Sequence, residues 1–326
     1  MENTKLKSIR DGFGEALLTL GEINKDVVVL TADLGDSTRV REFANKYPER
    51  FFDVGVAEQS LVTVAAGMAE AGEIPFTTSY AVFSPGRTFE QIKVTAAINN
   101  IPVKIVGEHA GFGASMYGAT HESLEDIALM RVIPNMVVVS PADYEEAKKA
   151  TIAVANNGKP TYLRLSRQDS PVFTKADDKF EIGKANILRD PSTSSGRRAD
   201  PQVAIIGCGP VLALALEAAE ELEKNGIETI VINNHTIKPM DETTIIRAAR
   251  TTGAVVTVEE HQIAGGMGSA VAEVLAHNFP VPIEFVGVKD SFGESAKTYQ
   301  ELWQKFGLTK ENIIESVKKV VARKNS

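Results

Sequence analysis

The stretch FFDVGVAEQSLVTVAAGMAEAG, residues 51–72, has the pattern of a strand followed directly by a helix. Its opening apolar residues indicate the end of a short buried strand, and Gly55 provides the turn that follows. Apolar residues then recur at helical spacing, which predicts a helix that runs to Gly72. A strand that leads directly into a helix is typical of α/β proteins. The apolar residues of this helix are Val56, Leu61, Val62, Val64, Ala65, Met68 and Ala69.

Glu58 lies in the first turn of the predicted helix and has two interpretations. The helix dipole stabilises an acid there by about 0.3–1 kcal/mol, which explains Glu58 as a helix cap. The first turn after a parallel strand also lies at the sheet edge where α/β folds bind ligands. A partly buried carboxyl group at that edge can hold a proton near neutrality.

Strand and helix patterns alternate along the chain. Runs of β-branched residues predict the strands, and amphipathic spacing predicts the helices. This alternation indicates mostly parallel sheets covered by helices on both faces. The strands are predicted at 27–31, 74–80, 103–107, 136–140, 161–165, 203–206, 229–233 and 254–258, and the helices at 4–21, 56–72, 85–99, 124–132, 143–156, 211–225, 242–251 and 267–277.

A length of 326 residues suits two domains. Residues 190–201 are mostly turn-forming and polar, so we place the domain boundary inside a linker at 173–201. The sequence therefore predicts an α/β protein with two doubly wound domains, at 5–172 and 202–326, each with a mostly parallel sheet flanked by helices.

Composition excludes several classes of function. There are 35 Lys and Arg against 43 Asp and Glu, a net charge of −8, without a basic stripe. We therefore expect neither nucleic acid nor an anionic membrane as a partner. The sequence has no apolar run near the roughly 18 residues of a membrane span and no apolar secretory core at its start, so we expect a cytoplasmic protein. Cys208 is the one cysteine in the sequence, which excludes an internal disulfide.

Two glycine-rich segments follow predicted strands. Gly265-Gly266-Met267-Gly268 either binds an anion through backbone N–H groups or packs a helix tightly on the sheet. Residues 108–123, EHAGFGASMYGATHES, form a loop without periodicity, and such long loops in compact domains are usually functional. His109 and His121 bracket this loop, and together they suit proton transfer near neutral pH.

A series of short motifs runs through the first half of the chain: Gly55-Val56-Ala57-Glu58-Gln59, Pro75-Phe76, Tyr80 with Phe83, His109-Ala110-Gly111, Gly118-Ala119-Thr120-His121, Pro134-Asn135-Met136, Pro141-Ala142-Asp143 and Leu165-Ser166-Arg167. Together they resemble the pyrimidine-binding half of transketolases over most of residues 5–172. The rest of the chain resembles the transketolase C-terminal domain. Each motif is weak alone, but their number and order are specific.

The resemblance implies that the chain binds thiamine diphosphate. It makes Glu58 the acid that hydrogen-bonds the pyrimidine ring, and Tyr80 and Phe83 the residues that stack against that ring. It places His121 near the cofactor's amine and includes Asp33 among the cofactor-binding residues. Without the resemblance, the two aromatic residues are explained as core residues at the end of a strand.

The resemblance also implies a site for a sugar phosphate. Arg10, Ser37, His109 and Arg167 match the positions that hold the phosphate, and guanidinium groups suit it because they bind two oxygens at once. Tyr117 departs from the family pattern, since transketolases have an acid there that reads a substrate hydroxyl. This departure leaves the donor ketose open.

The sequence lacks Gly-Asp-Gly, which transketolases use to bind the diphosphate and Mg²⁺. It also offers no recognisable third ligand beside the two histidines, so we predict no metal site in this chain. We predict the C-terminal subunit of a split transketolase, an α2β2 heterotetramer whose N-terminal subunit holds the diphosphate and Mg²⁺. The predicted reaction transfers a two-carbon ketol unit from a ketose or its phosphate to an aldose phosphate, in pentose phosphate metabolism.

Two other interpretations remain. A 1-deoxyxylulose-5-phosphate synthase or a 2-oxoacid dehydrogenase beta subunit shares the Glu-Gln helix and the C-terminal domain, although the synthases have an arginine at the position of His109. A non-catalytic subunit that stabilises or regulates a partner is the alternative from another class.

Overall fold

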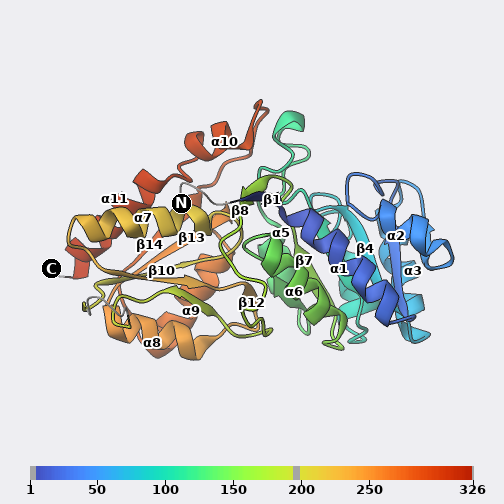
Figure 1. The fold of residues 1–326 in the computed structure, drawn as a ribbon, viewed down its shortest axis with the longest axis horizontal. Coiled ribbons are helices and arrows are strands. Elements are labelled where there is room, and N and C mark those ends of the chain that lie inside the picture. Colours follow the sequence, from blue (N-terminus) through green and yellow to red (C-terminus); the bar gives the residue numbers. More distant parts are fainter. Residues whose placement is uncertain (1–4, 194–198, 325–326) are drawn as a thin grey trace.

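A computed structural model describes residues 5–193 and 199–324 of the chain. Two α/β units lie side by side, the N-terminal one in blue to green and the C-terminal one in yellow to red (Figure 1). Each unit has a mostly parallel sheet with helices on both faces. The predicted fold class is therefore confirmed.

The N-terminal unit is built on a sheet with seven strands in the described part of the chain. Its strands are parallel except for one edge strand, β12, which comes from the C-terminal half of the sequence and pairs antiparallel with β6. The central strand β2 is buried at every position, as its β-branched run predicts. In spatial order the strands are β12 (Thr236–Lys238), β6 (Val137–Val139), β7 (Thr161–Arg164), β5 (Lys104–Glu108), β4 (Ile74–Tyr80), β2 (Val27–Thr31) and β3 (Phe51–Asp53).

Helices cover both faces of this sheet. On one face, α1 (Ile9–Ile23) packs against α6 (Tyr144–Ala155). On the other face lie α3 (Glu58–Glu70) and α4 (Phe89–Gln91), which continues as a π-helical segment, Ile92–Ala97. The shorter helices are α2 (Arg41–Lys46) and α5 (Asp126–Arg131).

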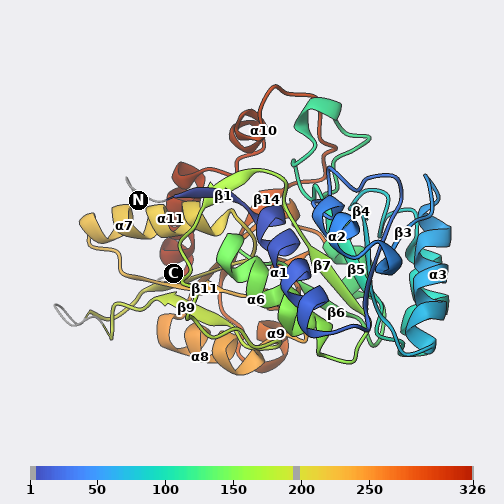
Figure 2. The ribbon, with the colours of Figure 1, turned by 45° about the vertical axis from the view of Figure 1, so that its right-hand side comes forward.

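The C-terminal unit repeats this architecture with five strands in the described residues. Helices α7 and α11 cover one face of its sheet, and α8 and α9 cover the other (Figure 2). The strand order is β14 (Ile283–Val288), β13 (Val255–Gln262), β10 (Val203–Gly207), β11 (Thr229–Asn233) and β9 (Asn186–Arg189), the last one antiparallel. The helices are α7 (Leu212–Lys224), α8 (Glu242–Thr252), α9 (Met267–Asn278), α10 (Tyr299–Lys305) and α11 (Lys310–Lys324).

The two units are joined at several places. Strand β9 lies inside the segment that we predict as a linker, and β1 (Leu6–Ser8) pairs antiparallel with β8 (Asp169–Pro171) at the end of the N-terminal unit. One cluster of buried apolar residues includes Met130 and Ile133 of the N-terminal unit together with Ile206 of the C-terminal unit. The units therefore share part of one core.

One local expectation from the 51–72 stretch is wrong. Strand β3 is not buried, because it lies at the edge of the sheet and pairs with β2 alone. Two residues of the predicted apolar helix face are exposed, Val56 by 75% and Val64 by 42%. In the described residues, every helix is too short or too polar to cross a membrane.

Candidate functional site

The candidate site lies where parallel strands of the seven-stranded sheet end. Strand β4 ends at Tyr80 and β5 ends at Glu108, and the loop after β2 carries Asp33 and Ser37. His109 follows β5 directly. Because the carboxyl ends of neighbouring parallel strands meet at one edge, the fold brings these loops together.

Glu58 is the first residue of α3 and is only 3% exposed. Its Oε2 accepts a hydrogen bond from Nη1 of Arg87 at 3.0 Å. The guanidinium group of Arg87 also lies over the ring of Phe83, 5.1 Å from its centroid. Arg87 therefore connects the buried carboxylate to the aromatic pair. The sequence gives no signal for this contact, since Arg87 lies in a loop 29 residues from Glu58.

The predicted aromatic and histidine residues form a continuous series of ring contacts. His109 stacks on Tyr80 at 3.9 Å between centroids, and Tyr80 stacks on Phe83 at 6.1 Å. Phe83 then meets His121 edge to face at 5.4 Å, and His121 contacts Tyr117 at 5.2 Å. We call these five residues the aromatic row. The structure thus brings together residues that are up to 41 positions apart in the sequence, from 80 to 121.

His109 is buried and has an unusual backbone conformation, with φ of +57°. Residues other than glycine rarely adopt this left-handed region, and strained positions of this kind cluster at functional sites. Burial, together with the charges of Arg10, Arg167 and Arg39, lowers the pKa of His109 to about 2. The imidazole is therefore neutral near pH 7. The sequence suggests that His109 and His121 transfer protons near neutral pH. A neutral His109 donates or accepts hydrogen bonds but does not exchange a proton in that range.

The residues predicted to hold phosphate lie around His109. Nη1 of Arg10 donates a hydrogen bond to the backbone oxygen of Ser37, which links α1 to the loop after β2. Burial lowers the pKa of Arg10, Glu108 opposes that shift, and Arg39 and Arg167 add to it. We call Arg10, Ser37, Arg39, His109 and Arg167 the anion cradle. The guanidinium groups of Arg10, Arg39 and Arg167 repel one another, and together they can attract an anion.

Asp33 belongs neither to the aromatic row nor to the anion cradle. It lies in an exposed turn with φ of +61°, and its backbone N–H donates to Oδ1 of Asp53 at 3.0 Å. The same oxygen also accepts the N–H of Gly55 at 3.0 Å, and Gly55 has a φ of +71°. Asp53 therefore holds the two turns at the entrance to α3. Sequence reasoning missed Asp53, although an acid two residues before a turn glycine is a recognised turn signal.

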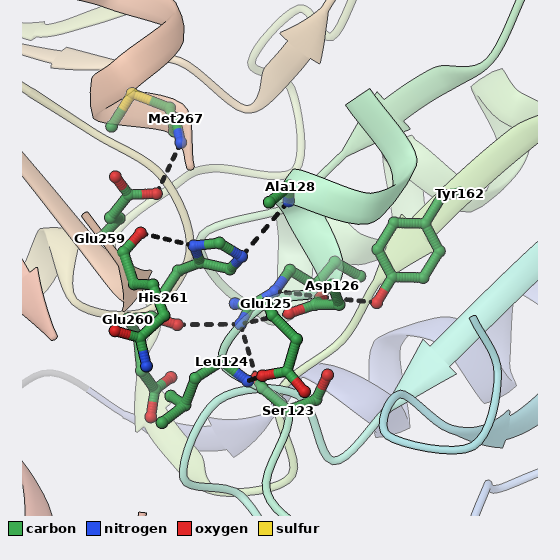
Figure 3. Close-up of polar contacts among 12 residues, drawn as sticks. Ser123, Leu124, Glu125, Asp126, Ala128, Tyr162, Glu259, Glu260, His261 and Met267 are labelled. Atoms are coloured by element: carbon green, nitrogen blue, oxygen red, sulfur yellow. Dashed lines mark hydrogen bonds and ion pairs between the residues drawn. The ribbon is translucent and has the colours of Figure 1, made fainter. Parts of the chain in front are cut away.

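The C-terminal unit contacts the loop that carries the two histidines and the segment that follows this loop, where Figure 3 shows His261 against Ala128. Oε1 of Glu260 accepts the backbone N–H of Phe112 at 3.0 Å and the indole N–H of Trp303 at 2.7 Å. Arg164 forms a buried ion pair with Asp126 at 2.7 Å and donates to the backbone oxygen of Glu260 at 2.9 Å. These contacts tie the position of the loop to the C-terminal sheet.

The same region settles the interpretation of the glycine-rich segment Gly265-Gly266-Met267-Gly268. The backbone N–H groups of Met267 and Gly268, at the start of α9, donate to the carboxylate of Glu259 at 2.6 and 2.8 Å. The anion at this helix start is thus a side chain of the protein itself. A Cβ on Gly266 or Gly268 would also clash with Glu259, which explains the glycines by close packing.

Models of known protein families match both halves of the chain. The family described as "Transketolase, pyrimidine binding domain" matches residues 5–172, and "Transketolase, C-terminal domain" matches residues 195–313. The chain belongs to the transketolase family.

Relatives of similar length support this membership. The 6-deoxy-6-sulfo-D-fructose transketolase subunit SqwH of Clostridium sp. (strain MSTE9) is 40% identical over 97% of this chain and 95% of its own length. One of the subunits of the apulose-4-phosphate transketolase of Phocaeicola vulgatus is 35% identical over 96% and 97%, respectively. A solved structure described as a split gene transketolase, an inactive beta4 tetramer, is 42% identical with a TM-score of 0.89 and covers 97% of this chain and 99% of that one.

The site of this transketolase-family chain fits the pyrimidine ring of thiamine diphosphate. The half-buried rings of Tyr80 and Phe83 offer apolar faces, and the buried carboxylate of Glu58 offers a hydrogen-bond partner to a ring nitrogen. The described residues do not fit the metal, because they contain no group of three or more His, Cys, Asp and Glu side chains that could hold one.

Proposed function

We propose that the chain is the C-terminal subunit of a two-subunit transketolase, which transfers a two-carbon ketol unit from a ketose phosphate to an aldose phosphate. An N-terminal subunit holds the diphosphate and Mg²⁺. The observation that carries the proposal is the buried carboxylate of Glu58 beside an aromatic row with a histidine near each end. Relatives that match over nearly their whole length are named as subunits, which supports the two-chain arrangement.

The aromatic row and Glu58 bind and orient the cofactor in this proposal. When bound, thiamine diphosphate supplies a nucleophilic carbon and an electron sink for the two-carbon unit. Glu58 would share a proton with the pyrimidine nitrogen, and Tyr80 and Phe83 would exclude water from the ring faces. His121 would lie near the cofactor's amine, and Asp33 would bind the cofactor from the exposed turn after β2.

The anion cradle binds the substrate in this proposal. Arg10, Ser37 and Arg167 hold the phosphate, and the neutral His109 provides a hydrogen bond to the substrate. Tyr117, which is 56% exposed at the end of the aromatic row, contacts the part of the ketose that distinguishes one donor from another.

Reconstitution tests the proposal. The chain is purified alone and together with a Gly-Asp-Gly protein encoded next to it, and thiamine-dependent transfer is measured with ketose phosphates and with pyruvate. We expect turnover of ketose phosphates by the pair and none by the chain alone. Robust turnover by the isolated chain refutes the two-chain arrangement. Use of pyruvate in place of ketose phosphates refutes the transketolase reaction and favours a deoxyxylulose-phosphate-synthase type of reaction.

A further inference from the structure

Glu108 is a buried acid that neither the fold nor the proposed reaction explains. It is the last residue of β5 and has no exposed surface. Val106, two residues earlier, packs in the cluster that contains α1, so Glu108 points to the same face of the sheet. Neither of its carboxyl oxygens has a hydrogen-bond partner among the residues that the structure describes.

Two neighbouring groups also have buried polar atoms without partners in the described chain. These atoms are Nε of Arg10 and Nδ1 of His109, both part of the anion cradle. Unpartnered buried polar atoms are rare in proteins, and each needs an explanation. Arg10 interacts electrostatically with both Glu108 and His109, and these two residues are adjacent in the sequence. We therefore explain the unpartnered atoms as parts of one polar site that a bound anion completes.

The charge of this site depends on Glu108. In the described chain, the charged groups that act on Glu108 and on the cradle are Arg10, Arg39, Arg167 and Asp11. Asp11 forms an ion pair with Arg39 at 2.8 Å, which leaves Arg10 and Arg167 uncompensated. With a protonated Glu108 the site has two net positive charges, and with an ionised Glu108 it has one.

We propose that Glu108 is a specificity-determining residue of the anion cradle: its neutral form strengthens the cradle's preference for a doubly charged phosphate over a singly charged sulfonate, and its ionised form weakens that preference. This inference rests on the proposed function, since it concerns the substrate's anionic group. Phosphate monoesters and sulfonates have similar tetrahedral shapes, so charge is what distinguishes them here. Glu108 acts through the electric field that it exerts on Arg10.

The pH range of the effect follows from the surroundings of Glu108. Burial raises the pKa of Glu108 to about 8, although Arg10 and Arg39 oppose the shift. The carboxyl is thus protonated at pH 7 and ionised at pH 9.5. His109 stays neutral throughout this range, and phosphate monoesters stay doubly charged because their second pKa is about 6. Anion affinity therefore falls as the pH rises through about 8.

Binding of methyl phosphate and of methanesulfonate to the full chain tests the inference. Between pH 7 and pH 9.5 we expect methyl phosphate to bind about tenfold more weakly, and methanesulfonate about threefold, because the Coulomb energy of the singly charged ion is half as large. In Glu108→Gln the affinity of both ions should be independent of pH. Glu146→Gln is the matched control, because Glu146 is also fully buried with a pKa raised to about 7 and lies away from the cradle, hydrogen-bonded to Asn233.

The wild-type chain alone provides a second measurement, which covers the case that Glu108→Gln does not fold. The carboxyl carbon of labelled Glu108 is followed by NMR, and methyl phosphate should raise its pKa because linkage between two sites is reciprocal. Methyl phosphate affinity that is independent of pH in the wild type, or a slope that persists in a folded Glu108→Gln, overturns the inference but leaves the proposed function intact. Absence of methyl phosphate binding at both pH values overturns the anion cradle itself.

Discussion

The imidazole of His109 lies against the phenol ring of Tyr80, with centroids 3.9 Å apart and ring planes at 29°. The other neighbour of Tyr80 in the aromatic row is Phe83, at 6.1 Å. Tyr80 thus stands between a residue proposed to bind substrate and one proposed to bind cofactor. A change at Tyr80 should affect both functions.

We expect Tyr80→Leu to weaken thiamine diphosphate binding up to about tenfold in the reconstituted pair, because the proposed stacking contact with the pyrimidine ring, about 0.5–1.5 kcal/mol, is lost. Titration of the cofactor into the cofactor-free pair measures this change. Tyr80→Phe is the control and should stay within about twofold, since it keeps the ring. Equal affinities in the Leu and Phe variants would show that the stack does not bind the cofactor.

Glu58→Gln should reduce turnover by about 10²- to 10⁴-fold, because it removes a proton-transfer partner but keeps the size of the side chain. Steady-state transfer by the reconstituted pair measures it. Glu70→Gln, at the exposed far end of α3, is the matched control and should have no effect. Unchanged turnover in Glu58→Gln would favour a non-catalytic subunit that stabilises or regulates its partner.

Much of the fold could be predicted because local patterns determine it. The β-branched run at Val27–Thr31 forms a strand at those residues, and so does Ile74–Tyr80. Asp143 caps α6 by accepting the N–H of Glu146, three residues along the chain, at 3.0 Å. These features depend on residues only a few positions apart in the chain, so they can be recognised in a single sequence.

Features that depend on distant partners could not be predicted. Strand β12 joins the N-terminal sheet although it follows β11 of the other unit, and no local pattern states which sheet it pairs with. The exposure of Val56 shows the same limit, because helical spacing identifies apolar residues but not what covers them. In the site, family motifs identified the aromatic row, whereas Arg87 and Glu108 became visible only through contacts and burial.

Lys104 gives a prediction about stability and pH. It is 1% exposed in β5, and burial lowers its pKa to about 7. Between about pH 7 and the ordinary lysine pKa near 10.5, the unfolded chain binds a proton that the folded chain does not, so this group makes stability rise with pH. Its contribution is at most about 1.4 kcal/mol per pH unit.

We therefore expect Lys104→Met to flatten the rise of the unfolding free energy between pH 7 and pH 10, as measured by urea denaturation. The substitution leaves no acceptor bare, because Asn157 Oδ1 still accepts the N–H of Lys159, and the backbone oxygen of Lys159 still accepts the hydroxyl of Thr161. Lys159→Met is a control at a more exposed lysine and should leave the slope unchanged. The same slope in Lys104→Met and wild type would contradict the assignment.

Trp303 tests whether the C-terminal unit positions the histidine loop. Its indole N–H and the backbone N–H of Phe112 donate to the same buried oxygen of Glu260. Trp303→Phe removes one donor from a buried carboxylate, which should cost about 1–3 kcal/mol of unfolding free energy. Burial already raises the pKa of Glu260, and the loss of a donor raises it further. A raised acid pKa in the folded state makes stability fall as pH rises, so the loss should be larger at pH 8 than at pH 5.

Urea denaturation at both pH values measures that difference, and hydrogen exchange of residues 109–123 measures the loop. We expect faster exchange in Trp303→Phe, together with a higher KM for the ketose phosphate, because the loop carries His109 and His121. Tyr299→Phe is the control, since its hydroxyl makes an exposed 3.3 Å contact with the backbone of Asp169. A stability loss that is equal at both pH values, without faster exchange in the loop, would show that Trp303 fills space but does not hold the loop through Glu260.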